Sequence, residues 1–345
     1  MNLPKRHRTS RGVAIALVMA SALSAVLLSS NPAQAAPSLV DIQIRVSQLQ
    51  MEASSAAEGA QAAKVQLASL TRTLSGIKQE AAAQGQNVAQ LRRSLGAIAV
   101  EQYKSGGLNQ SLELLFSSDP TLYLSAAGSL DALTRRKALQ LRKFSAAQQR
   151  LNATTFTVND KLKLVRAAQA RLTAQTAQAQ AKLKQAQKLL ASLKKSDRER
   201  LARLALLREN KDQASSLVLA KKVNGVSGRA GTALKYALKQ IGDLYVFGAA
   251  GNTYWDCSGL TMRAYQLAGV SLPHSAAAQA NYGKRVALNA LKPGDLVFFG
   301  RPIGHVGIYF GGGRMVDAPH SGARVKVQAF GSYFGRLRLV AARRF

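Results

Sequence analysis

Apolar residues recur at intervals of three and four positions over most of the first two thirds of the chain. The series Leu39, Ile42, Val46 and Leu49 opens this pattern, which continues to Ile98. A period close to 3.6 residues places such side chains on one face and predicts a long helix. The apolar stripe is narrow, and Gln, Ser, Ala, Lys and Arg fill the other faces. The pattern therefore predicts pairing with a second helix as a coiled coil.

Two clusters of turn-forming residues interrupt this helical pattern. The first is Lys104-Ser105-Gly106-Gly107 and the second is Ser117-Ser118-Asp119-Pro120. Breakers this close together indicate the tip of a hairpin of helices. A second run with helical periodicity follows from about Leu122 to Asp212. We therefore expect an antiparallel coiled-coil hairpin over residues 38–212, with its tip near residues 104–125.

The expected tip concentrates apolar and aromatic side chains where little protein is available to cover them. The residues concerned are Leu112, Leu115, Phe116 and Tyr123. Exposed apolar clusters mark sites of interaction with other proteins. The tip is therefore predicted to dock on a partner, and the alternative is an inert stalk.

The pattern changes again after residue 212. Residues 213–231 lose the heptad pattern and gain Ser, Asn and Gly, which predicts a flexible linker. Aromatic residues and glycines concentrate beyond it, in short segments typical of a compact α+β domain over residues 232–345. Within this domain Asp256 is a natural N-cap and Gly269 a natural stop, so a helix is expected to begin at Cys257.

The net charge and the N-terminal residues indicate where the protein is located and which partners it meets. The formal net charge is +31, which favours a polyanionic partner. Residues 1–35 combine a basic start, a short apolar run and an Ala-x-Ala site, the pattern of a secretory signal peptide. The alternative is an uncleaved membrane anchor. Export argues against nucleic acid as a partner. We therefore expect the protein in the cell wall or outside the cell, facing an anionic wall polymer.

The chain contains a single cysteine, Cys257, so it cannot form an intramolecular disulfide. The start of a helix favours the thiolate and lowers the pKa of a thiol, which makes Cys257 a candidate nucleophile. A lone cysteine can also be a small buried hydrophobic residue without chemistry. The decision between the two depends on whether a base lies nearby.

Two histidines of the C-terminal domain flank a predicted β-hairpin. His305 opens one strand, and His320 follows the other strand beyond the turn Gly311-Gly312-Gly313. With the hairpin centred between Gly312 and Gly313, His305 faces His320, which can orient it. Cysteine, histidine and a polar orienting group form a thiol-protease triad. The His and Cys spacings do not fit a zinc site, so we expect neither a metal nor another cofactor.

Several motifs of the C-terminal domain occur together in the order known from one family. They are Tyr245-Val246-Phe247-Gly248, Asp256-Cys257-Ser258-Gly259-Leu260, Lys292-Pro293-Gly294-Asp295-Leu296-Val297-Phe298-Phe299, Gly304-His305-Val306-Gly307-Ile308-Tyr309 and Asp317-Ala318-Pro319. This region resembles the NlpC/P60 cell-wall cysteine peptidases. The resemblance implies a papain-like domain that cleaves peptidoglycan stem peptides, typically between D-glutamate and the following diamino acid.

The resemblance also implies roles for single residues. Cys257 corresponds to the nucleophile, His305 to the base and His320 to the third polar residue. Tyr245 corresponds to a tyrosine beside the nucleophile, and by the same comparison Asp256 and Ser258 help receive the substrate.

The helical half is similar to the coiled coils of PcsB-like cell-separation hydrolases. That similarity implies docking of the tip on an FtsE-FtsX membrane complex and, with it, relief of autoinhibition. Two other functions stay open at the level of sequence. One is a non-catalytic scaffold that binds the wall, and the other is an amidase that cuts between muramic acid and L-alanine.

Overall fold

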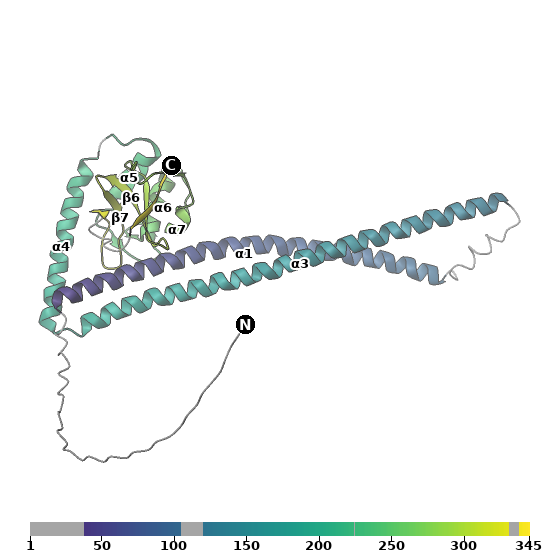
Figure 1. Ribbon diagram of the computed structural model, residues 1–345, viewed down its shortest axis with the longest axis horizontal. Helices are drawn as coiled ribbons and strands as arrows, with labels where there is room; N and C mark the ends of the chain where they lie inside the picture. The colour runs from purple at the N-terminus through teal and green to yellow at the C-terminus, as the bar shows by residue number, and fades with distance from the viewer. Residues whose placement is uncertain (1–37, 105–119, 224, 331–337) are drawn as a thin grey trace, which may run out of the picture. The chain divides into compact units, whose positions relative to one another are not determined.

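The computed structural model describes residues 38–104, 120–223, 225–330 and 338–345, and Leu39–Phe345 form one compact unit. Its first part is helical, with α1 (Leu39–Lys104), α3 (Pro120–Ala191) and α4 (Lys195–Lys221). Figure 1 shows α1 and α3 running side by side in opposite directions. The expected fold class, a helical N-terminal part before a sheet-containing C-terminal domain, is confirmed.

Small and apolar side chains hold the long helices together. Ile42, Val46 and Leu49 of α1 form a buried cluster with Ala186 of α3 and Leu201 of α4. Further along, α1 and α3 meet through alanines, among them Ala56, Ala57 and Ala179. A contact between two helices buries only a narrow stripe on each. Part of the apolar face expected on the second helix is consequently solvent-exposed, as for Leu133, Leu139 and Leu141.

The second helical run differs from its prediction at both ends of α4. A turn after Ala191 separates α3 from α4, so the run is not continuous to residue 212. Helix α4 then extends to Lys221, through half of the interval 213–231 that the sequence predicts as a linker. The reason is tertiary: Ser216 of α4 accepts a hydrogen bond of 2.9 Å from the backbone N–H of Val327 in strand β8 (Lys326–Ala329). Lys326 also bonds to Glu209 and Asp212, earlier in α4, at 2.9 and 3.0 Å. A helix gains stability from packing that its own composition does not reveal.

The C-terminal domain combines short helices with a six-stranded antiparallel sheet of order β4-β9-β5-β6-β7-β8. A small second sheet has the order β1-β3-β2. The elements are α5 (Gly228–Lys239), β1 (Leu244–Tyr245), β2 (Ala250–Gly251), β3 (Tyr254–Trp255), α6 (Cys257–Leu267), α7 (Ala276–Gln279), β4 (Lys284–Arg285), β5 (Leu296–Phe299), β6 (His305–Gly311), β7 (Arg314–Asp317), β8 (Lys326–Ala329) and β9 (Leu339–Arg344).

Strand β5 shows how the core is divided, because all four of its side chains are buried. Leu296 and Phe298 point to the main core, where they join α5 and α6, and Cys257 belongs to the same cluster. Val297 and Phe299 point to the opposite face, towards β7 and β9. Alternation along a strand sends neighbours to opposite faces, so a continuous apolar strand indicates a sheet covered on both sides.

Some expectations fall outside the described residues. These are the signal peptide at residues 1–35 and, at the tip, Leu112, Leu115, Phe116 and the side chain of Tyr123. Among the helices that the structure describes, none is both long and apolar enough to cross a membrane.

Candidate active site

Cys257 is the first residue of α6, and Asp256 sets the start of that helix. The carboxylate of Asp256 accepts a hydrogen bond of 2.6 Å from the backbone N–H of Gly259, as expected of an N-cap. Cys257 is fully buried and lies among apolar side chains of the main core. The cap thus fixes the position of the thiol at the beginning of a helix.

The carboxylate of Asp256 accepts hydrogen bonds from several neighbouring groups. Gly248 N–H donates to it at 2.9 Å, and Nε2 of His274 lies 2.8 and 2.9 Å from its two oxygens. Burial opposes the charged form of His274, but the hydrogen bond and charge of Asp256 outweigh burial and raise its pKa. With its oxygens engaged in this way, Asp256 positions the turn before Cys257. The family resemblance implies that Asp256 contacts the substrate directly, but in this arrangement both of its oxygens already accept hydrogen bonds.

His305 begins strand β6 and is almost completely buried. Its Nε2 lies 2.8 Å from Oδ2 of Asp317, the last residue of β7. Gln328 of β8 donates from Nε2 to both oxygens of Asp317 at 2.9 Å. Since a carboxylate only accepts hydrogen bonds here, Nε2 of His305 carries the proton and Nδ1 is its basic nitrogen.

The hairpin register explains why Asp317, and not His320, faces His305. Gly311 pairs with Arg314 as expected, but a bulge then shifts the register by one residue, so that Ile308 pairs with Val316. On the same face, Asp317 becomes the diagonal neighbour of His305, within reach of a side chain. The absence of a side chain at Gly307 leaves space for the side chain of Asp317, because a Cβ at Gly307 would lie 3.2 Å from Cβ of Asp317.

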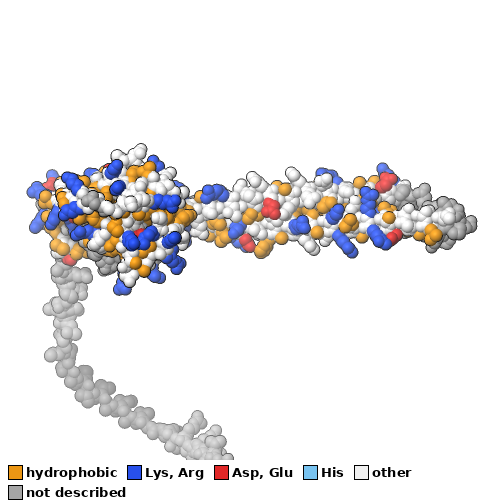
Figure 2. All heavy atoms as spheres, turned by 90° about the horizontal axis from the view of Figure 1, so that it is seen from above, with side chains coloured by type: hydrophobic (Ala, Val, Ile, Leu, Met, Phe, Trp, Pro, Cys, Tyr) orange, Lys and Arg blue, Asp and Glu red, His pale blue; other side chains and the backbone are white. Residues whose placement is uncertain are grey.

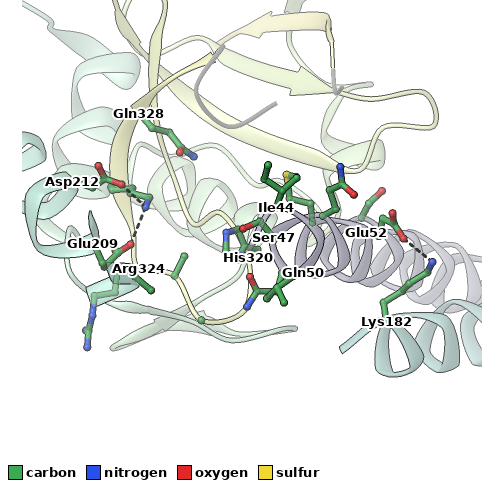
Figure 3. Close-up of a pocket in the computed structure, with 18 of the residues that line it drawn as sticks. Ile44, Ser47, Gln50, Glu52, Lys182, Glu209, Asp212, His320, Arg324 and Gln328 are labelled. Atoms are coloured by element: carbon green, nitrogen blue, oxygen red, sulfur yellow. Dashed lines mark hydrogen bonds and ion pairs between the residues drawn. The ribbon is translucent and has the colours of Figure 1, made fainter. Parts of the chain in front are cut away.

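His320 lies beyond the end of β7, so the expected pairing of His305 with His320 is wrong. Nδ1 of His320 donates to the carbonyl of Ser321 at 2.9 Å, and burial lowers its pKa. His320 lines a hollow of about 1870 Å³, together with Ser47 and Gln50 of α1. Figure 3 shows these three side chains among those around the hollow. The residues that line this hollow do not include Cys257.

The thiol of Cys257 lies beside the strand that carries His305. A backbone hydrogen bond from Val306, the next residue along, reaches the sulfur of Cys257. The thiol also donates to Oε1 of Glu58, a residue of α1, over 3.0 Å. Burial, followed by the charges of Glu58 and Asp256, raises the pKa of Cys257 well above its ordinary value. The expected lowering of the thiol pKa is therefore wrong for this conformation, because burial and nearby carboxylates outweigh the helix start.

Tyr245 and Ser258, which the resemblance associates with substrate, both lie in this neighbourhood. Tyr245 is buried, its hydroxyl lies 3.0 Å from Oγ of Ser54, and burial followed by the charge of Cys257 raises its pKa. Ser258 donates from Oγ to Oε1 of Glu58 at 2.6 Å. Both side chains thus face α1.

Sequence reasoning missed Glu58 and left Asp317 undecided. Asp317 carried a signal, because it belongs to one of the motifs on which the family resemblance rests. Glu58 carried a weaker one: it is an acidic residue within a run of small side chains, in a chain with 17 acidic residues against 48 basic ones. Within the described part of the chain, no group of three or more His, Cys, Asp or Glu side chains is placed to hold a metal ion.

Comparisons with known proteins match part of this chain. The family model described as NlpC/P60 matches residues 242–344. A protein of Mycobacterium tuberculosis named a probable endopeptidase is 43% identical over 104 residues, 30% of this chain and 27% of that protein. The probable endopeptidase p60 of Listeria monocytogenes is 41% identical over 109 residues, 29% of this chain and 22% of that protein.

A solved structure, that of a hypothetical invasion protein of Mycobacterium tuberculosis, matches at 27% identity and a TM-score of 0.31, covering 34% of this chain and 62% of that one. This chain covers only about a quarter of the length of the two probable endopeptidases, 27% and 22%. The residues that match the family model, 242–344, include Cys257, His305 and Asp317. Residues 242–344 therefore form a domain of the NlpC/P60 family, which this chain carries behind the helices α1, α3 and α4.

Proposed function

We propose that the chain is a cysteine peptidase that hydrolyses peptides of peptidoglycan, with Cys257 as nucleophile, His305 as base and Asp317 as the residue that orients His305. The observation that carries this proposal is the His305–Asp317 hydrogen bond of 2.8 Å beside a cysteine at the start of a helix. It reproduces the roles of a thiol-protease triad. Membership of the domain in a family whose named relatives are probable endopeptidases supports the same reaction.

The proposed reaction has two stages. In the first, Nδ1 of His305 takes the thiol proton and the sulfur of Cys257 attacks the carbonyl carbon of the peptide bond. The C–N bond then breaks, and the imidazolium gives its proton to the leaving amine. In the second stage His305 takes a proton from water, whose oxygen attacks the thioester. The C–S bond breaks, releasing a carboxylic acid and restoring the thiol.

Asp317 stabilises the imidazolium that forms in both stages and holds the ring in one tautomer. It takes the place that the sequence assigned to His320. Tyr245 and Ser258 lie next to Cys257 and are proposed to contact the substrate, and Asp256 is proposed to hold the turn that presents the thiol.

The finer features of the function rest on the sequence. We propose that the bond cleaved joins D-glutamate to the diamino acid of the stem peptide, and that the enzyme acts in cell separation or wall remodelling. Residues 1–35 are proposed to direct secretion, and the tip near residues 104–125 to dock on a membrane complex of the FtsE-FtsX type. Basic side chains support a place in the anionic wall: Figure 2 shows Lys and Arg over the domain and along the long helices, with few acidic residues.

Digestion of purified muropeptides with the full-length chain, followed by mass spectrometry of the new ends, tests the proposal. Because Glu58 bonds to the thiol in this structure, the assay includes Glu58→Ala beside the wild type. We expect new D-glutamyl carboxyl ends, and none from either chain once Cys257 is replaced by Ala. Release of whole stem peptides beginning with L-alanine would identify an amidase, and binding without cleavage by any variant a scaffold.

A further inference from the structure

His274 lies in the loop between α6 and α7, and neighbouring contacts hold this loop in place. Gln279 of α7 is fully buried and donates from Nε2 to the carbonyl of Pro273 at 2.9 Å and to the carbonyl of Ser258 at 2.8 Å. On the other side of His274, Ser275 is also fully buried and caps the start of α7. The imidazole is thus carried by a loop whose backbone is fixed on both sides.

The imidazole reaches the carboxylate of Asp256 because Gly259 has no side chain. A Cβ at Gly259 would lie 2.9 Å from Oδ1 of Asp256 and 3.0 Å from Nε2 of His274. As it is, Nε2 of His274 stands 2.8 and 2.9 Å from the two carboxylate oxygens, and this is the ion pair that Asp256 makes within the described residues. The side chain of His274 is 20% exposed and that of Asp256 1%, so water screens their attraction only weakly.

The carboxylate of Asp256 has two opposing effects on the nucleophile. By accepting from Gly259 N–H at 2.6 Å it caps α6 and fixes the place where Cys257 begins the helix. Its negative charge, however, raises the pKa of Cys257, after burial and the charge of Glu58. A cap of this kind therefore disfavours the thiolate unless a positive charge offsets it.

His274 can supply that positive charge. Burial opposes its charged form, but the hydrogen bond and charge of Asp256, followed by the charge of Glu58, raise its pKa above the ordinary value, against a smaller opposing effect of Lys64. The charged groups that face the ring thus come from the turn before α6 and from α1. A raised pKa means that the imidazolium is present at low pH and is lost as the pH rises through that value.

We propose that His274 is a positioning residue for Cys257: its imidazolium holds the carboxylate of Asp256 in place and offsets the negative charge beside the thiol. A protonated ring makes charge-assisted hydrogen bonds, which are about twice as strong as neutral ones, and it reduces the field that opposes the thiolate. The meaning for hydrolysis rests on the proposed function, but the effect on the thiol does not. Reaction of Cys257 with iodoacetamide needs the thiolate and no peptide, and the chain has no other cysteine.

Two full-length variants separate the charge of His274 from its hydrogen bond. His274→Gln keeps an N–H for Asp256 but carries no charge, and His274→Arg carries a charge throughout the pH range in which histidine titrates. Ser271→Arg, at an exposed position of the same loop, is the matched control for an added cation. Each chain is also made with Glu58→Ala, since the charge of Glu58 acts on His274 as well.

The readouts are the rate of alkylation by iodoacetamide, followed by intact mass, and kcat and KM for muropeptide cleavage, both as functions of pH. At about pH 6, where the imidazolium is present, we expect alkylation of His274→Gln to be about tenfold slower than that of the wild type, as for the loss of one nearby opposite charge. His274→Arg should match the wild type there. As the pH rises, the wild type should lose its advantage over His274→Gln, and His274→Arg should keep it.

Cleavage should follow alkylation, with kcat in the same order, KM unchanged and Ser271→Arg equal to the wild type. Equal rates of wild type and His274→Gln at every pH would overturn the proposal. So would a His274→Arg variant as slow as His274→Gln, because the shape of the ring and not its charge would then matter. A higher KM at unchanged kcat and alkylation would assign His274 to substrate binding instead.

The two proposals fail in different ways. The expected order of alkylation without cleavage by any variant leaves the role of His274 standing and removes the peptidase. Circular dichroism and thermal melting show whether each variant folds. If His274→Arg does not, His274→Lys takes its place, and an NMR titration of the histidine rings decides. The resonance that is missing from His274→Gln should titrate above the ordinary value of about 6.5 in the wild type, and a midpoint below it would overturn the proposal.

Discussion

Replacing Asp317 by Asn tests which residue orients the proposed base. Asp317 is fully buried, and its carboxylate accepts from Nε2 of His305 at 2.8 Å and from Gln328 at 2.9 Å. The amide is nearly the same size, so the change removes the charge and leaves the packing. It also offers an N–H where Nε2 of His305 needs an acceptor.

The magnitude follows from the hydrogen bond that is lost. A hydrogen bond to a charged group contributes about 1.5–3 kcal/mol, which corresponds to about a 10- to 150-fold fall in kcat. KM should change little, because Asp317 acts through His305 and has no contact with the substrate in the proposed mechanism. Asp317→Glu, which restores the charge, should recover part of the rate.

The assay measures muropeptide cleavage by the full-length chain, in the wild-type background and again with Glu58→Ala, so that the comparison does not depend on α1. His320→Asn is the matched variant, because the sequence placed His320 in the same role. We expect His320→Asn to change kcat by less than about threefold, as for substitutions away from such contacts. Loss of activity in His320→Asn together with full activity in Asp317→Asn would refute the reasoning.

Two further predictions concern the thiol and its support. The raised pKa of Cys257 means that less thiolate is present at a given pH. Burial and then the charge of Glu58 cause the raised pKa, so Glu58→Gln should move the pH midpoint of alkylation below that of the wild type. Identical pH profiles would contradict this. Gln279 is fully buried and bonds to the Thr261 hydroxyl and the Ser258 carbonyl, so Gln279→Ala should lower the free energy of unfolding by about 2–4 kcal/mol in urea denaturation. The exposed Gln266→Ala serves as control, and an equal effect in both variants would show that the buried bonds of Gln279 contribute nothing.

Local patterns predicted the elements that depend on neighbouring residues. Asp256 was expected to cap the helix that starts at Cys257, and it does so through Gly259. The glycine turn after β6 likewise predicts the hairpin of β6 and β7. Caps, turns and strand alternation are decided within a few residues, which is why the sequence carries them directly.

The residue that orients His305 is harder to predict, because a bulge of one residue decides which side chain faces His305. The prediction counted from the centre of the turn and reached His320, but the shift beyond Gly311 brings Asp317 to the face of His305. A one-residue change of register alters every pairing beyond it. The count from the turn selects His320, and only the register observed in the structure selects Asp317.

By itself, the sequence determined the long helices, the α+β domain and the candidate nucleophile with its histidine, since each follows from periodicity, turn chemistry or a short motif. Only the tertiary structure decided that α4 covers the edge of the sheet, that Asp317 orients His305 and that Glu58 meets Cys257. Glu58 and Cys257 are 199 positions apart in the chain. A contact over such a distance depends on how whole elements pack against one another, and local preference carries no record of it.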